Sequence, residues 1–154
     1  MKTSVNIILL WAITMLMCGC THNNGDIGDL FGTWKLENIT IDGAADEAYG
    51  NNIVWKFQSS IIEMQQVDDA LHESLNSYGT WSRPADGVMK LDFTHTDNSY
   101  PEPGAAHYSP LPATHLPKAQ VIALDILELN GSKMKLRYID ADASTTIEYY
   151  FKKW

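Results

Sequence analysis

The sequence predicts an all-β fold, an antiparallel barrel or sandwich, for the body of this 154-residue chain. Short runs of alternating apolar and polar residues recur from residue 32 onward, as expected for half-buried strands. Turn-forming residues separate these runs. No helical pattern of about 10–15 residues alternates with them, which disfavours an α/β fold. Eight runs are recognised: 32–41, 52–58, 61–67, 75–82, 88–94, 121–129, 133–139 and 145–153.

The first four runs lie in the first half of the chain. The first run ends at Asp42-Gly43, a dipeptide that favours a tight hairpin turn. In the second run, Ile53, Trp55 and Phe57 share one face. The third and fourth runs continue the pattern, although residues 68–77 also fit a helical turn.

The last four runs are bounded by equally clear turns. Asp86-Gly87 precedes the fifth run, and Asn130-Gly131 separates the sixth from the seventh. The sixth run is largely apolar. In the other three, alternate residues form one apolar face: Met89, Leu91 and Phe93, then Met134, Leu136 and Tyr138, then Ile147, Tyr149 and Phe151.

Residues 95–119 stand apart, because they hold five of the six prolines. Proline has no N–H for a sheet ladder, so this segment is expected to be a long loop between the fifth and sixth strands. Two interpretations remain open. The loop is either an ordered crossover that packs Tyr108, Leu111 and Leu116 on one end of the fold, or a gate for a ligand.

The N-terminus has the features of a secretory signal. Lys2 provides a positive start, and residues 5–17 form an apolar run that is too short for a membrane span of about 20 residues. Residues 1–19 are therefore predicted to be removed. Residues 20–30 are polar and glycine-rich, and are expected to form a flexible tether.

Both cysteines of the chain, Cys18 and Cys20, lie at the end of this signal. A disulfide between residues two apart would be strained, and a thiol-exchange motif needs two intervening residues. The remaining interpretations are acylation of Cys20 and an ordinary signal peptide with incidental cysteines. After cleavage the body would contain no other cysteine, hence no disulfide, thiolate nucleophile or cysteine metal site.

The charge of the chain argues against nucleic acid as a partner. The formal net charge is −8, and removal of the signal would make it one unit more negative by removing Lys2. An acidic protein with scattered cations repels phosphate backbones. We interpret the acidity mainly as a source of solubility.

The segment Met17-Cys18-Gly19-Cys20 resembles a bacterial lipobox, in which a small residue precedes the acylated cysteine. Phe31-Gly32-Thr33-Trp34 resembles the Gly-x-Trp signature of lipocalins. The order of further short motifs resembles the small lipocalin-like lipoproteins of Gram-negative bacteria over residues 31–154. These motifs are Tyr78-Gly79-Thr80-Trp81, Met89-Lys90-Leu91, Ile126-Leu127-Glu128-Leu129, Met134-Lys135-Leu136 and Tyr149-Tyr150-Phe151-Lys152-Lys153.

This resemblance implies an eight-stranded up-and-down barrel whose last strand closes on its first, with residues 31–154 as one lipocalin-like domain. It also implies that a basic side chain from the last strand lies over Trp34, and Lys152 or Lys153 is expected there. Such a cation–π contact would seal one end of the barrel rather than bind a ligand.

An eight-stranded barrel is either filled by side chains or holds one small ligand, and the sequence leaves both alternatives open. An apolar cavity would be lined by residues on the inward faces of the strands. The candidates are Trp55, Phe57, Met64, Trp81, Leu91, Phe93, Met134, Leu136, Tyr138, Tyr149 and Phe151.

The sequence offers little support for a metal site, a cofactor or catalysis. His107 and His115, with Asp97 and Glu102 nearby, lack the spacing of a zinc site. Residues 140–144 begin like a calcium loop but lack its glycine and final acidic residue, so a turn is expected there. Motifs of serine hydrolases, zinc proteases and phosphate-binding loops do not occur. We therefore expect a non-enzymatic protein without metal or cofactor.

The sequence thus predicts a lipid-anchored envelope protein that binds a small apolar or amphipathic molecule. Its partners would be the membrane, through the lipid on Cys20, and a small hydrophobic ligand. Thr21 follows Cys20 where an aspartate would suggest retention at the inner membrane, so the outer membrane is expected. The alternative is a filled barrel whose loops contact another envelope protein.

Overall fold

A computed structural model describes residues 28–68, 73–99, 102 and 104–154. The predicted signal, both cysteines and most of the predicted tether lie outside these residues. Within the described residues, no helix has the length and apolarity needed to cross a membrane.

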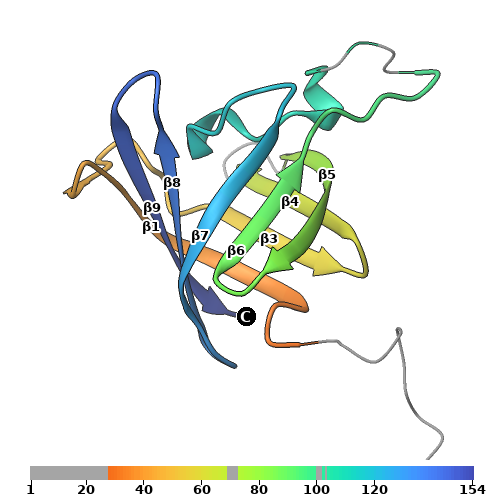
Figure 1. The fold of residues 1–154 in the computed structure, drawn as a ribbon. Coiled ribbons are helices and arrows are strands. Elements are labelled where there is room, and N and C mark those ends of the chain that lie inside the picture. Colours follow the sequence, from red (N-terminus) through yellow and green to blue (C-terminus); the bar gives the residue numbers. More distant parts are fainter. Residues whose placement is uncertain (1–27, 69–72, 100–101, 103) are drawn as a thin grey trace, which may run out of the picture.

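The described chain forms a closed eight-stranded antiparallel β-barrel with one short additional strand (Figure 1). Strand β2 pairs only with the end of β1, and the barrel closes where β1 pairs with β9. The strands are β1 (Gly32–Ile41), β2 (Ala44–Ala45), β3 (Ile53–Gln58), β4 (Ile61–Asp68), β5 (Glu73–Ala85), β6 (Val88–Asp92), β7 (Val121–Leu129), β8 (Lys133–Asp140) and β9 (Thr145–Lys153).

All eight predicted strands are present, and the barrel rather than the sandwich alternative is confirmed. The alternative of a helical turn at residues 68–77 is wrong for those of them that the structure describes. Asp68 ends β4, and residues 73–77 belong to β5. These residues pair in register across the β4–β5 hairpin, for example Val67 with Ser74. Residues 69–72 lie outside the described part of the chain.

Irregularities in strand register explain departures from strict alternation in β1 and β7. In β1, Leu36 pairs with Phe151 and Asn38 with Tyr150, so Glu37 is an extra residue. The inward face therefore changes from even to odd positions, and Leu36 and Ile39 are both fully buried. A similar irregularity in β7 separates Ile126 from Glu128.

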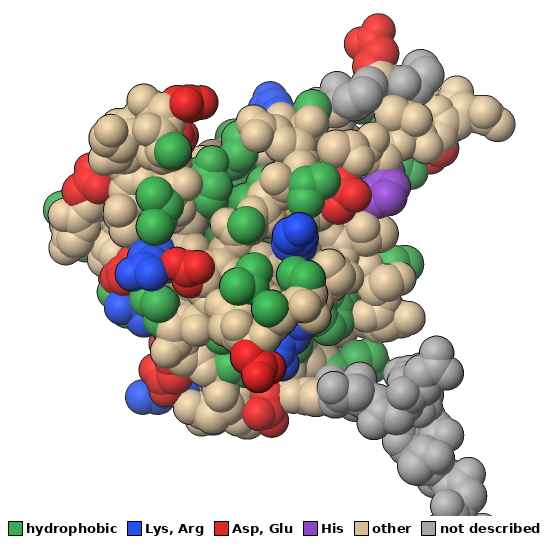
Figure 2. All heavy atoms as spheres, in the orientation of Figure 1, with side chains coloured by type: hydrophobic (Ala, Val, Ile, Leu, Met, Phe, Trp, Pro, Cys, Tyr) green, Lys and Arg blue, Asp and Glu red, His purple; other side chains and the backbone are tan. Residues whose placement is uncertain are grey.

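The core lies inside the barrel and continues beyond both ends of the sheet. Leu30, the last residue of the predicted tether, is buried in this core. Its inclusion follows from local geometry, because the Trp34 indole N–H donates to the Leu30 carbonyl at 2.7 Å. Figure 2 shows that hydrophobic side chains also reach the surface in patches between charged ones.

Candidate functional site

The barrel interior is the first candidate site, and most predicted lining residues are fully buried there. Trp81 and Tyr138 are only partly buried and pack against the edge of the core. The buried members of the predicted set are Trp55, Phe57, Met64, Leu91, Phe93, Met134, Leu136, Tyr149 and Phe151.

Aromatic rings occupy much of this interior. The ring centroid of Trp55 lies 4.8 Å from that of Phe151 and 5.8 Å from that of Tyr149. Phe57 packs edge-on against Trp81 at 5.4 Å. Such tilted and edge-to-face pairs add about 0.5–1.5 kcal/mol each beyond their burial. The rings therefore form a packed cluster at the centre of the candidate site.

The interior is uncharged but contains unpaired hydrogen-bond donors. Among the described residues, no Asp, Glu, Lys or Arg side chain is buried. The indole N–H groups of Trp55 and Trp81 are buried and have no hydrogen-bond partner within this part of the chain. Each such group costs about 1–3 kcal/mol. An indole can only donate, so a complementary ligand would bring an acceptor atom.

One end of the barrel is covered by residues 109–116 from the connection between β6 and β7. Leu111 and Leu116 are buried in the core, and the short helix η3 (Pro112–Thr114) lies between them. We call this segment, residues 109–116, the plug. The interpretation of the segment as ordered packing agrees with the positions of Leu111 and Leu116, whereas Tyr108 lines an outer groove instead.

Two buried hydrogen bonds attach the plug to the barrel. The Tyr149 hydroxyl donates to the Thr114 carbonyl at 2.8 Å, and the Ser77 hydroxyl donates to the Ser109 carbonyl. Burial raises the pKa of Tyr149, which keeps its phenol protonated as a donor. The polar residues at the plug end of the barrel were not identified from the sequence, because they do not belong to an alternating apolar pattern. They are Ser77, Ser109 and Thr114.

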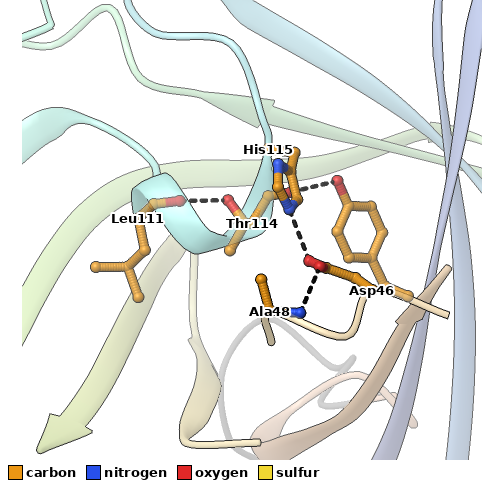
Figure 3. Close-up of polar contacts among 6 residues, drawn as sticks. Asp46, Ala48, Leu111, Thr114 and His115 are labelled. Carbon is orange, nitrogen blue, oxygen red and sulfur yellow. Dashed lines mark hydrogen bonds and ion pairs between the residues drawn. The ribbon is translucent and has the colours of Figure 1, made fainter. Parts of the chain in front are cut away.

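An ion pair attaches the plug to the connection between β1 and β3 (Figure 3). His115 Nε2 lies 2.8 Å from Asp46 Oδ2, while Asp46 Oδ1 accepts from the Ala48 N–H at 3.0 Å. The hydrogen bond from His115 lowers the pKa of Asp46. These residues therefore join two segments that are far apart in sequence at the rim of the barrel.

This ion pair predicts a small pH dependence of stability. Because the pKa of Asp46 is lowered on folding, its contribution is fully present above the unfolded value and lost as the pH falls through the folded value. We expect Asp46→Asn to lower the free energy of unfolding by less than about 1 kcal/mol near pH 5, because the contact is solvent-accessible. The deficit should disappear near pH 2. Asp86→Asn, at an exposed turn, is the control, and a pH-independent deficit would contradict the assignment.

The opposite end of the barrel contains Trp34 and the end of β9. Trp34 is fully buried, and Lys153 Nζ lies 4.6 Å from its ring centroid. Lys153 also donates to the Asp29 carbonyl at 2.6 Å. Of the two lysines considered from the sequence, Lys153 makes this contact, whereas Lys152 is exposed on the neighbouring position of the strand.

The described histidines do not gather with acidic residues into a metal site within the described residues. His107 lies against Tyr78, with ring centroids 4.8 Å apart, and His115 is paired with Asp46. The predicted turn after β8 is present. Its Asp140 side chain accepts from the N–H groups of Asp142 and Ala143, each at 3.0 Å.

The comparisons with known proteins agree with this barrel. Residues 15–154 match the model of the lipocalin-like domain family, and the chain belongs to that family. It is similar to the crystal structure of a lipocalin-like protein from Bacteroides uniformis, at 17% identity and a TM-score of 0.57, with 82% of this chain and 100% of that chain covered.

A second similar structure is that of an uncharacterized protein from Bacteroides eggerthii. It is 17% identical, with a TM-score of 0.59, and the comparison covers 81% of this chain and 99% of that one. At these identities the likeness shows the fold alone. Among curated proteins, none matches this sequence.

Proposed function

We propose that this protein binds a small apolar or amphipathic molecule inside its barrel and performs no catalysis. The observation that carries the proposal is the pair of buried, unpartnered indole N–H groups, on Trp55 and Trp81, in an uncharged apolar interior. Membership of the lipocalin-like family supports it, because eight-stranded barrels of this kind can hold one small ligand. Entry would require displacement of the plug or of the closed end.

The donors favour a neutral ligand with an acceptor oxygen. An ionised ligand would have to lose its hydration in an interior where no buried cation is present among the described residues. A ketone, ester or similar group would instead accept a hydrogen bond from Trp55. The remainder of the molecule would be apolar, to match the surrounding aromatic and aliphatic side chains.

A matched pair of probes tests this function. We expect 2-octanone to displace a neutral fluorescent dye from the purified protein, and octane to do so more weakly. Trp55→Phe removes the hydrogen-bond donor but keeps an aromatic ring. It should therefore weaken the binding of 2-octanone by about tenfold, the equivalent of one hydrogen bond. The affinity for octane should change less. Trp154→Phe, at an exposed position, is the matched control.

A second candidate function is favoured by the close ring packing around Trp55. If the rings fill the barrel, the protein acts as an envelope interaction module, in which the fold presents its loops to another protein. In that case neither probe would bind saturably, although the protein would be folded. If Trp55→Phe lowered the affinities for 2-octanone and for octane equally, the indole N–H would not be a hydrogen-bond donor to the ligand.

The proposed location is the cell envelope, with the chain held at the outer membrane by lipid on Cys20. This part of the proposal is supported by the signal-like residues 1–19, by Gly19-Cys20 and by Thr21. Two or more acyl chains would anchor the protein stably where one would not.

The lipid anchor is tested by replacing its acceptor. We expect Cys20→Ser to abolish acylation, so that the protein loses the mass of the lipid and leaves the membrane fraction or accumulates as precursor. Cys18→Ser is the matched control and should retain both properties. A Cys20→Ser protein that stays membrane-bound with the wild-type mass would contradict the proposal.

A further inference from the structure

A groove on the outer face of the barrel is separate from the interior site. It has a volume of about 510 Å³ and lies where the connection after β6 passes over β4 and β5. Ile61, Tyr78 and Thr80 contribute from the strands, and His95, His107 and Tyr108 from the connection. The helix η2 (Ala106–Tyr108) holds the last two of these against β5.

Strand alternation separates this groove from the barrel interior. Tyr78 and Thr80 face outward, whereas Ser77 and Gly79 are buried on the inward face of the same strand. A Cβ on Gly79 would lie 2.9 Å from the ring of Phe93, so this interior ring packs directly against the strand backbone. A ligand in the groove would therefore contact different side chains from a ligand near Trp55.

The groove presents a continuous aromatic corner. The ring centroid of His107 lies 4.8 Å from that of Tyr78 and 4.9 Å from that of Tyr108, the latter in an edge-on arrangement. Ile61 adds an aliphatic surface that is half exposed, at 50%. These surfaces suit the faces of a flat ring rather than a flexible chain, because aromatic groups pack best with offset or edge-on partners.

Polar and acidic groups at the groove disfavour an anionic ligand. Thr80 Oγ1 and His95 Nε2 are 3.0 Å apart, and both groups can donate or accept according to the histidine tautomer. No lysine or arginine lines the groove among the described residues. The carboxylates nearby, Asp92 close to His95 and Asp97 bonded to the Tyr108 hydroxyl, would repel an anion.

We propose that this outer groove is a second binding site, for a small, planar, uncharged aromatic molecule that carries a hydroxyl or similar hydrogen-bonding group. The ring lies against Tyr78 and His107, and the polar group reaches the Thr80–His95 pair. This site goes beyond the proposed interior ligand and does not depend on it. The two sites differ in the shape of the ligand, because the groove would take a flat aromatic ring, whereas the interior would take a largely apolar molecule that accepts a hydrogen bond from Trp55.

The test uses the mature protein, purified from its own membrane into lipid nanodiscs, with ¹³C-labelled histidine side chains, and the matched probes 2-naphthol and 2-naphthoate. We expect 2-naphthol to shift the His95 and His107 signals saturably and to leave His115 unchanged. The anion 2-naphthoate should bind at least tenfold more weakly. Empty nanodiscs provide the correction for partition of each probe into lipid.

Three variants distinguish this site from the interior and from a general loss of structure. Thr80→Val keeps the shape of the side chain but removes one hydrogen bond. It should therefore weaken the binding of 2-naphthol by about threefold to tenfold. Ile139→Ala, an exposed apolar position on β8, and Trp55→Phe should leave this affinity unchanged. Absence of saturable shifts, equal affinity for both probes, or sensitivity to Trp55→Phe would overturn the proposal.

Discussion

Trp34→Ala is expected to lower the free energy of unfolding by about 3–5 kcal/mol, as for other large core truncations. The ring is fully buried, its N–H donates to Leu30, and Lys153 covers one face. Truncation would create a cavity, leave the Leu30 carbonyl unpaired, and expose the ammonium group of Lys153 to an apolar gap. Chemical denaturation monitored by far-ultraviolet circular dichroism measures the effect.

The chain supplies a matched control for this change. The side chain of Trp154 is 81% exposed. Its backbone N–H donates to the Thr33 carbonyl at 3.0 Å, and Trp154→Ala preserves this bond because it changes only the side chain. We expect the control to cost less than about 0.5 kcal/mol, as for surface substitutions generally. A similarly small loss for Trp34→Ala would show that this tryptophan does not seal the barrel.

The second large effect concerns the plug. Leu111 is 1% exposed and packs in the core, so Leu111→Ala is expected to cost about 2–5 kcal/mol. Leu75→Ala, at a position that is 49% exposed, is the control and should be nearly neutral. Denaturation of the two variants measures the difference. A neutral Leu111→Ala would mean that the plug contributes little to the fold.

The same substitution bears on ligand exchange. If an interior ligand enters past the plug, Leu111→Ala should speed both binding and release of 2-octanone, because its buried contact with the barrel is weakened. Leu75→Ala should leave both rates unchanged. Unchanged rates in the Leu111 variant would indicate entry at another position, while the stability result would still stand.

The strands could be predicted because their physical signal is local. Ile53, Trp55 and Phe57 alternate with polar or less buried neighbours, and the turns at Asp42-Gly43 and Asn130-Gly131 fix where strands end. The bulge at Glu37 could not be predicted this way. It depends on the pairing of β1 with β9, which lies at the other end of the chain.

The candidate sites were predicted less completely, because they depend, like the bulge at Glu37, on contacts between segments that are distant in sequence. Inward residues such as Trp55 and Tyr149 follow from alternation, but the plug depends on hydrogen bonds between segments distant in sequence. Tyr149 and Thr114, for example, are 35 residues apart. Nothing local to His115 indicates that it would meet Asp46. The outer groove also depends on a contact between segments distant in sequence, namely β5 and η2.

Native mass spectrometry of the mature protein, extracted from its own membrane, is the most direct test of ligand binding inside the barrel. We expect a species heavier than the acylated chain by the mass of one small molecule, and we expect that molecule to be lost when 2-octanone is added in excess. Trp55→Phe should reduce the fraction of the heavier species, whereas Trp154→Phe should not. A wild-type protein that shows only the mass of its acylated chain, and takes up no 2-octanone, would contradict binding inside the barrel.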